Sequence, residues 1–172
     1  FNVPKAKSYF ISFQAWGERD EWQYPVIVKP VDSAGSKGVT KVDSEDQLID
    51  AIHFALEFSI SDEFIIEAWI EKDGCSSDSD CFSLNGEFQI LTYSSQRFDS
   101  AAANPYAPVA FSWPSTMGEK AENELSSELQ RLISLLGMKS SIYNVETRLG
   151  QDGNPYIMEV SPRGGGNRLA EV

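Results

Sequence analysis

Histidine and cysteine are scarce in this sequence. Among 172 residues there is one histidine, His53, and there are two cysteines, Cys75 and Cys81. Mechanisms that rely on a histidine base or on a cluster of imidazole ligands are therefore disfavoured. The two cysteines leave open a disulfide or half of a metal site, but no second ligand pair accompanies them, which favours free intracellular thiols.

Long apolar runs and positive charge are also lacking. No apolar run reaches the roughly 20 residues that a membrane-spanning helix needs, and no secretory pattern is present, so we expect a cytoplasmic protein. Lys and Arg number 14 against 26 Asp and Glu, a net charge of −12. Such a surface repels phosphate backbones and anionic lipids, so neither nucleic acid nor a membrane is expected as a partner.

Hydrophobic residues make up 41% of the chain, enough to build a core without disulfides. The chain begins at Phe1 without a methionine, and we expect it to be part of a longer polypeptide whose other domains are its partners. Short β-branched or aromatic segments bounded by breakers predict strands. These strands are expected at 9–13, 25–29, 39–42, 64–70, 81–84, 87–91, 141–149 and 155–160.

Two segments have helical periodicity. Ser44 and Gln47 form a capping-box pattern ahead of an apolar stripe that starts at Leu48. Thr116 is expected to cap the second helix, and Gly137 stands where a C-terminal glycine should. Between the strands, Asn85-Gly86 predicts a hairpin, and residues 99–118 predict a long loop.

This order of elements predicts an α+β fold in two lobes, because βαβ-like elements come first and antiparallel strands with one packed helix follow. The polar stretch 71–80 is the expected boundary. We therefore predict a smaller lobe at 1–72 and a larger lobe at 73–172.

The last predicted hairpin brings two acidic residues together. If Asp152-Gly153 is the centre of a tight type I′ turn, Glu146 faces Glu159 and Arg148 faces Ile157. Like charges directly opposite each other are destabilising. A divalent cation such as Mg²⁺, which takes one or two carboxylates together with substrate phosphates, would explain the pair.

A second interpretation of the acidic pair stays open. Arg148 and Arg163 could neutralise the acidic pair as a surface salt-bridge cluster, with no metal involved.

Elsewhere, Lys29 and the loop Ser33-Ala-Gly-Ser-Lys-Gly38 could bind phosphate oxygens through backbone N–H groups. That loop taken alone is equally typical of a mobile surface turn, and it is not the P-loop pattern.

Five segments taken in order resemble the ATP-grasp family, in the branch of biotin carboxylase and the carbamoyl-phosphate synthetase large chain. They are Pro25-Val-Ile-Val-Lys29-Pro, Ser33-Ala-Gly-Ser-Lys-Gly-Val39, Phe64-Ile-Ile-Glu-Ala-Trp-Ile70, Tyr143-Asn-Val-Glu-Thr-Arg148 and Tyr156-Ile-Met-Glu-Val-Ser-Pro-Arg163. The resemblance implies an ATP-grasp fold with the nucleotide cleft between the lobes. It also implies ATP and Mg²⁺ as ligands, with Mn²⁺ as an alternative ion.

The resemblance implies a role for each matching residue. Nucleotide contacts would come from Lys29, the loop residues Ser33, Gly35, Ser36, Lys37 and Gly38, and the hinge residues Glu67, Ala68 and Ile70. Metal ligands would be Glu146, Glu159 and Ser161. Arg163 would steady the transferred phosphoryl group, and Arg148 is assigned to catalysis with it.

Two positions depart from the family pattern. Ser161 stands where the family often has a metal-binding asparagine, and a hydroxyl is a weaker Mg²⁺ ligand. Ser76 stands where a ribose-binding glutamate is common, leaving Glu71 or Asp73 as substitutes.

The expected activity is that of an ATP-dependent ligase, which activates a small carboxylate or bicarbonate as an acyl-phosphate for attack by an amine or another nucleophile. A nucleotide-binding module without chemistry and an acidic scaffold without a ligand are the alternatives.

Overall fold

The computed structural model describes residues 8–10 and 23–166. The predicted strand residues 11–13, and Asn167 and Arg168 of the glycine-rich end, lie outside these ranges. The chain divides into two compact units. Unit 1 contains Glu71–Phe98 and the chain from Pro108 onward, and unit 2 contains the chain from Ala6 to Ile70 together with Asp99–Ala107.

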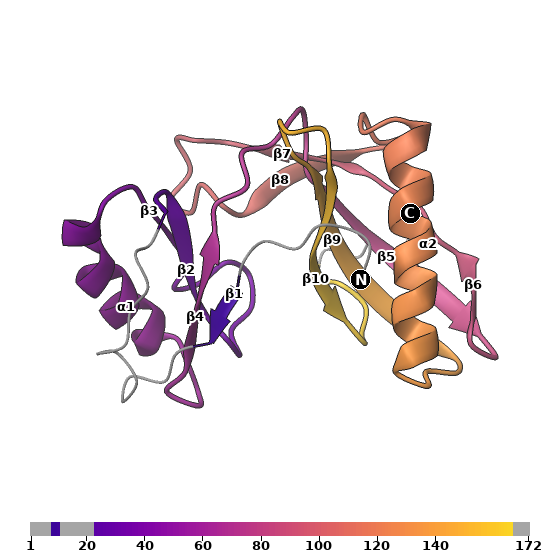
Figure 1. Cartoon of the computed structure of the whole chain (residues 1–172), viewed down its shortest axis with the longest axis horizontal. Helices are drawn as coiled ribbons and strands as arrows, with labels where there is room; N and C mark the ends of the chain where they lie inside the picture. Colours follow the sequence, from indigo (N-terminus) through magenta and orange to yellow (C-terminus); the bar gives the residue numbers. More distant parts are fainter. Residues whose placement is uncertain (1–7, 11–22, 167–172) are drawn as a thin grey trace. The chain divides into compact units, whose positions relative to one another are not determined.

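Unit 2 has a four-stranded antiparallel sheet with one helix packed on it (Figure 1). The strand order is β1 (Ser8–Phe10), β4 (Phe64–Ala68), β2 (Val26–Pro30), β3 (Thr40–Val42). A 3₁₀ turn, η2 (Glu45–Gln47), leads into α1 (Leu48–Glu57). The helix buries its apolar stripe on one face of the sheet. Buried residues of this core are Val26, Val28, Val42, Leu48, Ala51, Ile52, Ala55, Phe64 and Ile66.

The predicted capping box before α1 is wrong. The Ser44 side chain makes no cap hydrogen bond, and Gln47 Oε1 accepts the backbone N–H of Asp43 at 3.1 Å. The helix forms nonetheless, because burial of its apolar stripe contributes more than one cap.

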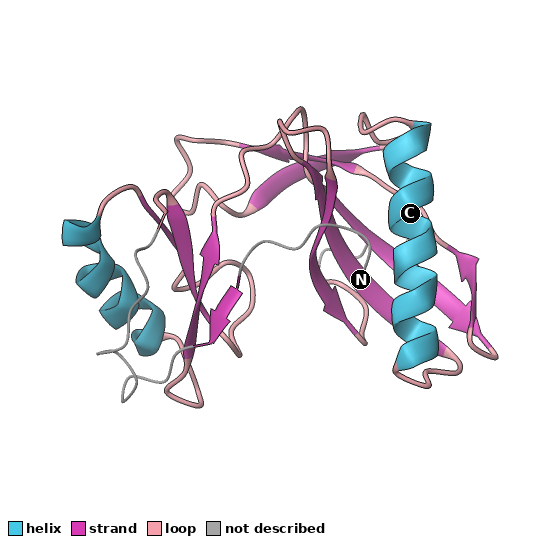
Figure 2. Cartoon of the chain, in the orientation of Figure 1, coloured by secondary structure: helices cyan, strands magenta, loops and turns pink. Residues whose placement is uncertain are grey.

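Unit 1 has a second antiparallel sheet, in the order β10 (Pro155–Ser161), β9 (Ser141–Leu149), β5 (Ser77–Leu84), β6 (Glu87–Ile90). Helix α2 (Glu119–Leu135) lies along it (Figure 2). Leu125, Leu129 and Ile133 of the helix pack with Cys81, Tyr143 and Val145 of the sheet. The α+β class predicted from the order of elements is confirmed.

Both ends of α2 are set by glycines. Gly118, with φ of 85°, occupies the N-cap position, so the predicted Thr116 cap is wrong. At the other end, Gly137 has φ of 65°, Met138 N–H donates to Ile133 O at 3.0 Å, and Gly137 N–H donates to Ser134 O at 3.1 Å. These two bonds are a Schellman motif, so the predicted C-terminal glycine is confirmed.

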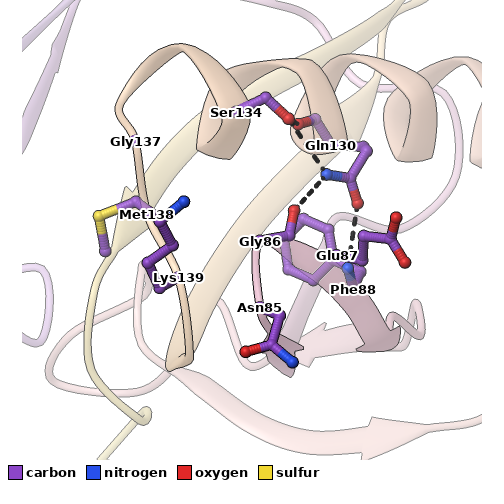
Figure 3. A pocket seen from close by; sticks show the side chains of 9 residues that line it. All are labelled: Asn85, Gly86, Glu87, Phe88, Gln130, Ser134, Gly137, Met138 and Lys139. Carbon is purple, nitrogen blue, oxygen red and sulfur yellow. Dashed lines mark hydrogen bonds between the residues drawn. The ribbon is translucent and has the colours of Figure 1, made fainter.

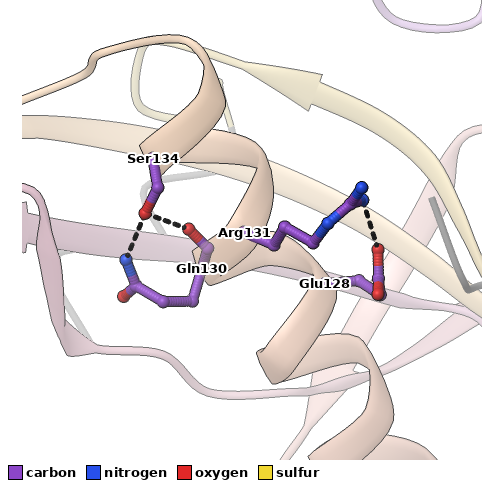
Figure 4. A network of polar contacts seen from close by, with 4 residues as sticks. All are labelled: Glu128, Gln130, Arg131 and Ser134. Atoms are coloured by element: carbon purple, nitrogen blue, oxygen red, sulfur yellow. Dashed lines mark hydrogen bonds and ion pairs between the residues drawn. The ribbon is translucent and has the colours of Figure 1, made fainter.

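Polar side chains along α2 satisfy one another. Arg131 pairs with Glu128 at 3.3 Å, and Ser134 Oγ donates to the backbone oxygen of Gln130 at 2.8 Å (Figure 4). Within the described ranges, no helix is both long and apolar enough to cross a membrane.

The middle of the chain holds more strand than the sequence predicts. Residues 99–118 are not all loop, because β8 (Pro108–Ser112) pairs with β7 (Ser95–Phe98). Residues 77–80, expected at a lobe boundary, lie in β5, where Ser77, Asp78 and Ser79 are buried. Serine side chains make this possible: Ser77 and Ser79 Oγ accept the N–H of Ser94, at 3.0 and 3.2 Å.

Candidate functional site

The carboxylate pair lies on the sheet of unit 1. Strands β9 and β10 pair so that Glu159 is directly opposite Glu146. The prediction that these two side chains face each other is confirmed. Glu146 is half-buried and Glu159 is exposed, which leaves the pair open on the face away from α2.

The register arises differently from the prediction, which assumed a type I′ turn. Gly150 N–H donates to Asn154 O at 2.9 Å, so the loop has three residues and ends at Gly153, whose φ is 78°. Arg148 therefore faces Tyr156, not Ile157, and that part of the prediction is wrong. A bulge between Ile157 and Glu159 adds one residue to β10, which brings the glutamates back into alignment.

The bulge also changes which β10 side chains reach the core. Ile157 and Val160 pack against the hydrophobic core of unit 1. The Tyr156 hydroxyl donates to Asp152 Oδ2 at 2.6 Å. This hydrogen bond from Tyr156 lowers the pKa of the Asp152 carboxyl.

Strand β5 extends the polar face beyond the pair. Asp78 is opposite Glu146, and Asp80 is opposite Asn144. The Asn144 amide donates to Asp78 Oδ1 at 2.5 Å and to Asp80 Oδ1 at 3.2 Å. No role for either aspartate was predicted from the sequence. Their spacing of two residues on a strand was the available signal, because it places both on one face.

The two arginines assigned to catalysis differ in environment. Arg148 Nε donates to Ser76 Oγ at 3.1 Å, at the position expected to hold a ribose-binding acid. Burial lowers the pKa of Arg148, and Glu146 and Glu71 act in the opposite direction. Arg163 is exposed and donates to Gly164 O at 2.9 Å.

In unit 2, the candidate nucleotide-binding residues Lys29 and Glu67 lie on β2 and β4. Val26 and Val28 point into the core, so Lys29 emerges on the opposite face. There its ammonium forms an ion pair with Glu67 of β4. Ala68 is the last ladder residue of β4, opposite Val26, and Ile70 follows at the end of unit 2.

The glycine-rich loop of unit 2 is held at several points. Gly35 and Ser36 have φ of 67° and 55°, so their backbone turns left-handed at two successive residues. Gly38 is buried, and a Cβ there would lie 3.1 Å from Phe58. Ser33 and Lys37 are exposed and available to a ligand.

A second segment of unit 2 touches this loop. Ser36 Oγ donates to Tyr106 O, and Asn104 Nδ2 donates to Gly35 O, both at 3.2 Å. The hydroxyl proton of Ser36, a residue expected to contact the nucleotide, is thus engaged by Tyr106. At the base of the loop, Asp32 accepts N–H groups of Ile60 and Ser61, at 3.0 and 2.8 Å, and these bonds lower its pKa.

A pocket of unit 1 is lined by none of the predicted site residues. It is lined by the Asn85–Phe88 turn, the end of α2 and Lys139 (Figure 3). The Gln130 amide, its central polar group, is already satisfied: it accepts from Phe88 N–H at 3.0 Å and donates to Gly86 O at 2.8 Å. Glu87 and Lys139 are the charged residues of its lining, and it holds no pair of carboxylates, so the carboxylate face remains the candidate site.

The two cysteines are not bonded to each other. Both are free thiols, as predicted, and burial raises the pKa of Cys81 to about 12. Among the described residues, no group of three or more His, Cys, Asp or Glu is arranged to hold a metal ion. A pair of carboxylates still suits Mg²⁺, since that ion keeps waters and takes further oxygens from substrate phosphates.

The fold, the carboxylate pair and the lysine residues are those expected of a protein that binds a metal ion together with a phosphate group. The family model described as the ATP-grasp domain matches residues 22–171. The chain therefore belongs to the ATP-grasp family, as the sequence motifs indicated.

Known relatives are ligases and synthases. A D-alanine–D-alanine ligase of Flavobacterium psychrophilum is 25% identical over 173 residues, covering 96% of this chain and 51% of the relative. A carbamoyl phosphate synthase large chain of a Thermoanaerobacter species is 24% identical over 140 residues, covering 81% and 13%. The chain thus spans about half or less of these relatives.

Among solved structures, an L-amino acid ligase from Bacillus licheniformis superimposes with a TM-score of 0.72. Sequence identity is 23%, and the match covers 95% of this chain and 37% of that ligase.

Proposed function

We propose that this chain is the nucleotide- and metal-binding part of an ATP-dependent ligase that joins a small acid to an amine or another nucleophile. An oxygen of the acid attacks the γ-phosphorus of ATP, the bond to the β–γ bridging oxygen breaks, and ADP leaves. The nucleophile then attacks the acyl-phosphate carbon and phosphate leaves.

The observation that carries this proposal is the cross-strand pair of Glu146 and Glu159. Directly opposite residues have Cβ atoms about 4.5–5.5 Å apart, where like charges are unfavourable. Magnesium held by both would offset that repulsion and would supply charge neutralisation for the phosphates. The family resemblance implies that Ser161 is a further ligand of the same metal.

The remaining site residues would position the triphosphate, since phosphoryl transfer depends on orientation and on neutralising charge. Lys29 would contact a phosphate group and the edge of the adenine ring. Ser33, Gly35, Ser36, Lys37 and Gly38 would cover the phosphates, with Glu67, Ala68 and Ile70 as the adenine hinge. Arg163 and Arg148 would stabilise charge that develops on the transferred group.

The names of the relatives favour a carboxylate as the acid and an amine as the nucleophile, because two of the three join amino acids. Carbamoyl-phosphate-synthase-like chemistry would use bicarbonate in the same first step. The second candidate is a nucleotide-binding module without chemistry, favoured by Ser76 at the position of the ribose acid.

Glu159→Gln tests the proposal. The protein is incubated with Mg-ATP and pooled carboxylic acids and amines, and ADP is measured. We expect the substitution to lower ADP formation at least roughly 100-fold, because one essential charge-stabilising group is removed. Glu87→Gln, exposed on β6 of the same sheet, is the matched control and should keep full activity.

The outcomes separate the candidates. Equal turnover by Glu159→Gln and wild type would contradict the assignment of the metal site. A thermal shift of the wild type with Mg-ATP but no ADP with any acid would favour the binding module.

A further inference from the structure

We propose that Asn144, through its side-chain oxygen, is the third protein ligand of the metal held by Glu146 and Glu159, and that Ser161 is not. This inference rests on the proposed function. The family often has an asparagine ligand at position 161 on β10. In this chain the asparagine stands at the position directly opposite, Asn144 on β9.

The strand register places Asn144 beside the carboxylate pair. Asn144 is directly opposite Ser161, two residues along each strand from Glu146 and Glu159. Residues two apart on a strand share a face, so the four side chains form a compact square on one side of the sheet. An oxygen from either position 144 or position 161 can therefore approach an ion held by the glutamates.

Neighbouring carboxylates fix the orientation of the Asn144 amide. Its Nδ2 donates to Asp78 Oδ1 at 2.5 Å and to Asp80 Oδ1 at 3.2 Å, both on β5. An ionised carboxylate only accepts hydrogen bonds, so the nitrogen must face β5. The oxygen, on the other arm of the planar amide, is then directed away from β5.

That oxygen is left available. Asn144 is 7% exposed, and within the described part of the chain no donor is recorded for its Oδ1. Its Oδ1 is not one of the fully buried side-chain atoms without a partner, so solvent or an ion can reach it. A hard cation such as Mg²⁺ or Mn²⁺ accepts amide and carboxylate oxygens together, so a bound ion would satisfy it.

Ser161 has a different partner. Its Oγ donates to Glu159 Oε1 at 2.9 Å. A hydroxyl that donates to a ligating carboxylate orients that carboxylate, as groups around metal ligands commonly do. The weak ligand at position 161 thus supports Glu159, and the amide oxygen comes from the facing strand.

The segment Gly164-Gly165-Gly166 packs against Asp80 and Asn144. Gly165 N–H donates to Asp80 Oδ1 at 2.7 Å, and a Cβ at Gly165 would lie 2.7 Å from Asn144 Nδ2. A contact that short would displace the amide. A residue without a side chain therefore lets the segment close over Asn144 and fix the aspartate that orients it.

The test measures Mn²⁺ binding by electron paramagnetic resonance, with a non-hydrolysable ATP analogue present and without turnover. Asn144→Ala should weaken Mn²⁺ binding roughly 10- to 100-fold, within the range found for groups around metal sites. The double variant Asn144→Ala/Ser161→Asn should regain most of that loss, because it returns an amide oxygen to the square. Asn123→Ala, on the exposed side of α2, is the control.

Ser161→Ala keeps the network of Asn144 with its aspartates intact and guards against a folding defect. We expect it to weaken Mn²⁺ binding less than Asn144→Ala does, because Ser161 orients one ligand whereas Asn144 would supply one. A loss from Ser161→Ala as large as from Asn144→Ala, or an unchanged affinity of Asn144→Ala, would overturn the inference. Absence of Mn²⁺ binding by the wild type with the analogue would instead refute the proposed function.

Discussion

Thr147 lies on β9 between Glu146 and Arg148, with its side chain on the core face. It is fully buried, and its hydroxyl has no hydrogen-bond partner within the described residues. A buried, unsatisfied hydroxyl costs about 1–3 kcal/mol. Substitution by a side chain of the same shape and without the hydroxyl removes that cost.

We therefore expect Thr147→Val to raise the free energy of unfolding by about 1 kcal/mol, measured by urea denaturation. Ser83 is the matched comparison, because it is equally buried but donates to Lys139 O and bonds the Tyr143 hydroxyl, both at 3.0 Å. Ser83→Ala should destabilise by about 1 kcal/mol. A destabilised Thr147→Val would mean that the hydroxyl has a partner in solution.

At the scale of single elements, the end of α2 depends on one residue. Gly137 adopts a left-handed φ of 65°, and a Cβ there would meet nothing within 4 Å. The cost of a side chain is therefore a backbone cost, about 1–2 kcal/mol for an L-residue.

Gly137→Ala should lower the free energy of unfolding by about 1 kcal/mol. Gly137→Asn should cost less, since asparagine is the other residue common at this position. Urea denaturation of both variants checks the order. Equal losses would show that the loss comes from packing and not from the backbone angle.

The hairpin of β9 and β10 shows why element prediction can succeed for an incomplete reason. The facing of Glu146 and Glu159 was predicted from a two-residue turn, whereas a three-residue loop and a bulge near Met158 produce it together. Side-chain alternation along each strand is local, but a bulge depends on how the strand packs.

At the scale of the whole molecule, Cys81 reports on the integrity of unit 1. It is 1% exposed within the core under α2, and burial raises its pKa to about 12. The thiolate is the reactive form, so Cys81 remains a protonated, unreactive thiol at pH 8 to 10. Cys75 is half-buried and accepts a hydrogen bond from Arg97.

A disulfide reagent at pH 8 should therefore label one thiol per native chain quickly and the second at the rate of unfolding. Cys75→Ser should remove the fast phase and leave the slow one. Two fast thiols in the native protein would contradict the burial of Cys81 in the folded core.

The sequence alone determined the helices, most strands, the α+β class and the family, because these follow from local periodicity, glycines at turns and ordered motifs. Side-chain alternation also predicted that Glu146 faces Glu159, although the loop and the bulge that align them depend on packing. Tertiary structure decided what required distant partners: β7 and β8, the burial of the serine-rich start of β5, and the contact of the glycine loop with residues 104 and 106. The orientation of Asn144 belongs with these, since two carboxylates more than sixty residues away in the chain fix it, and no local pattern records such a contact.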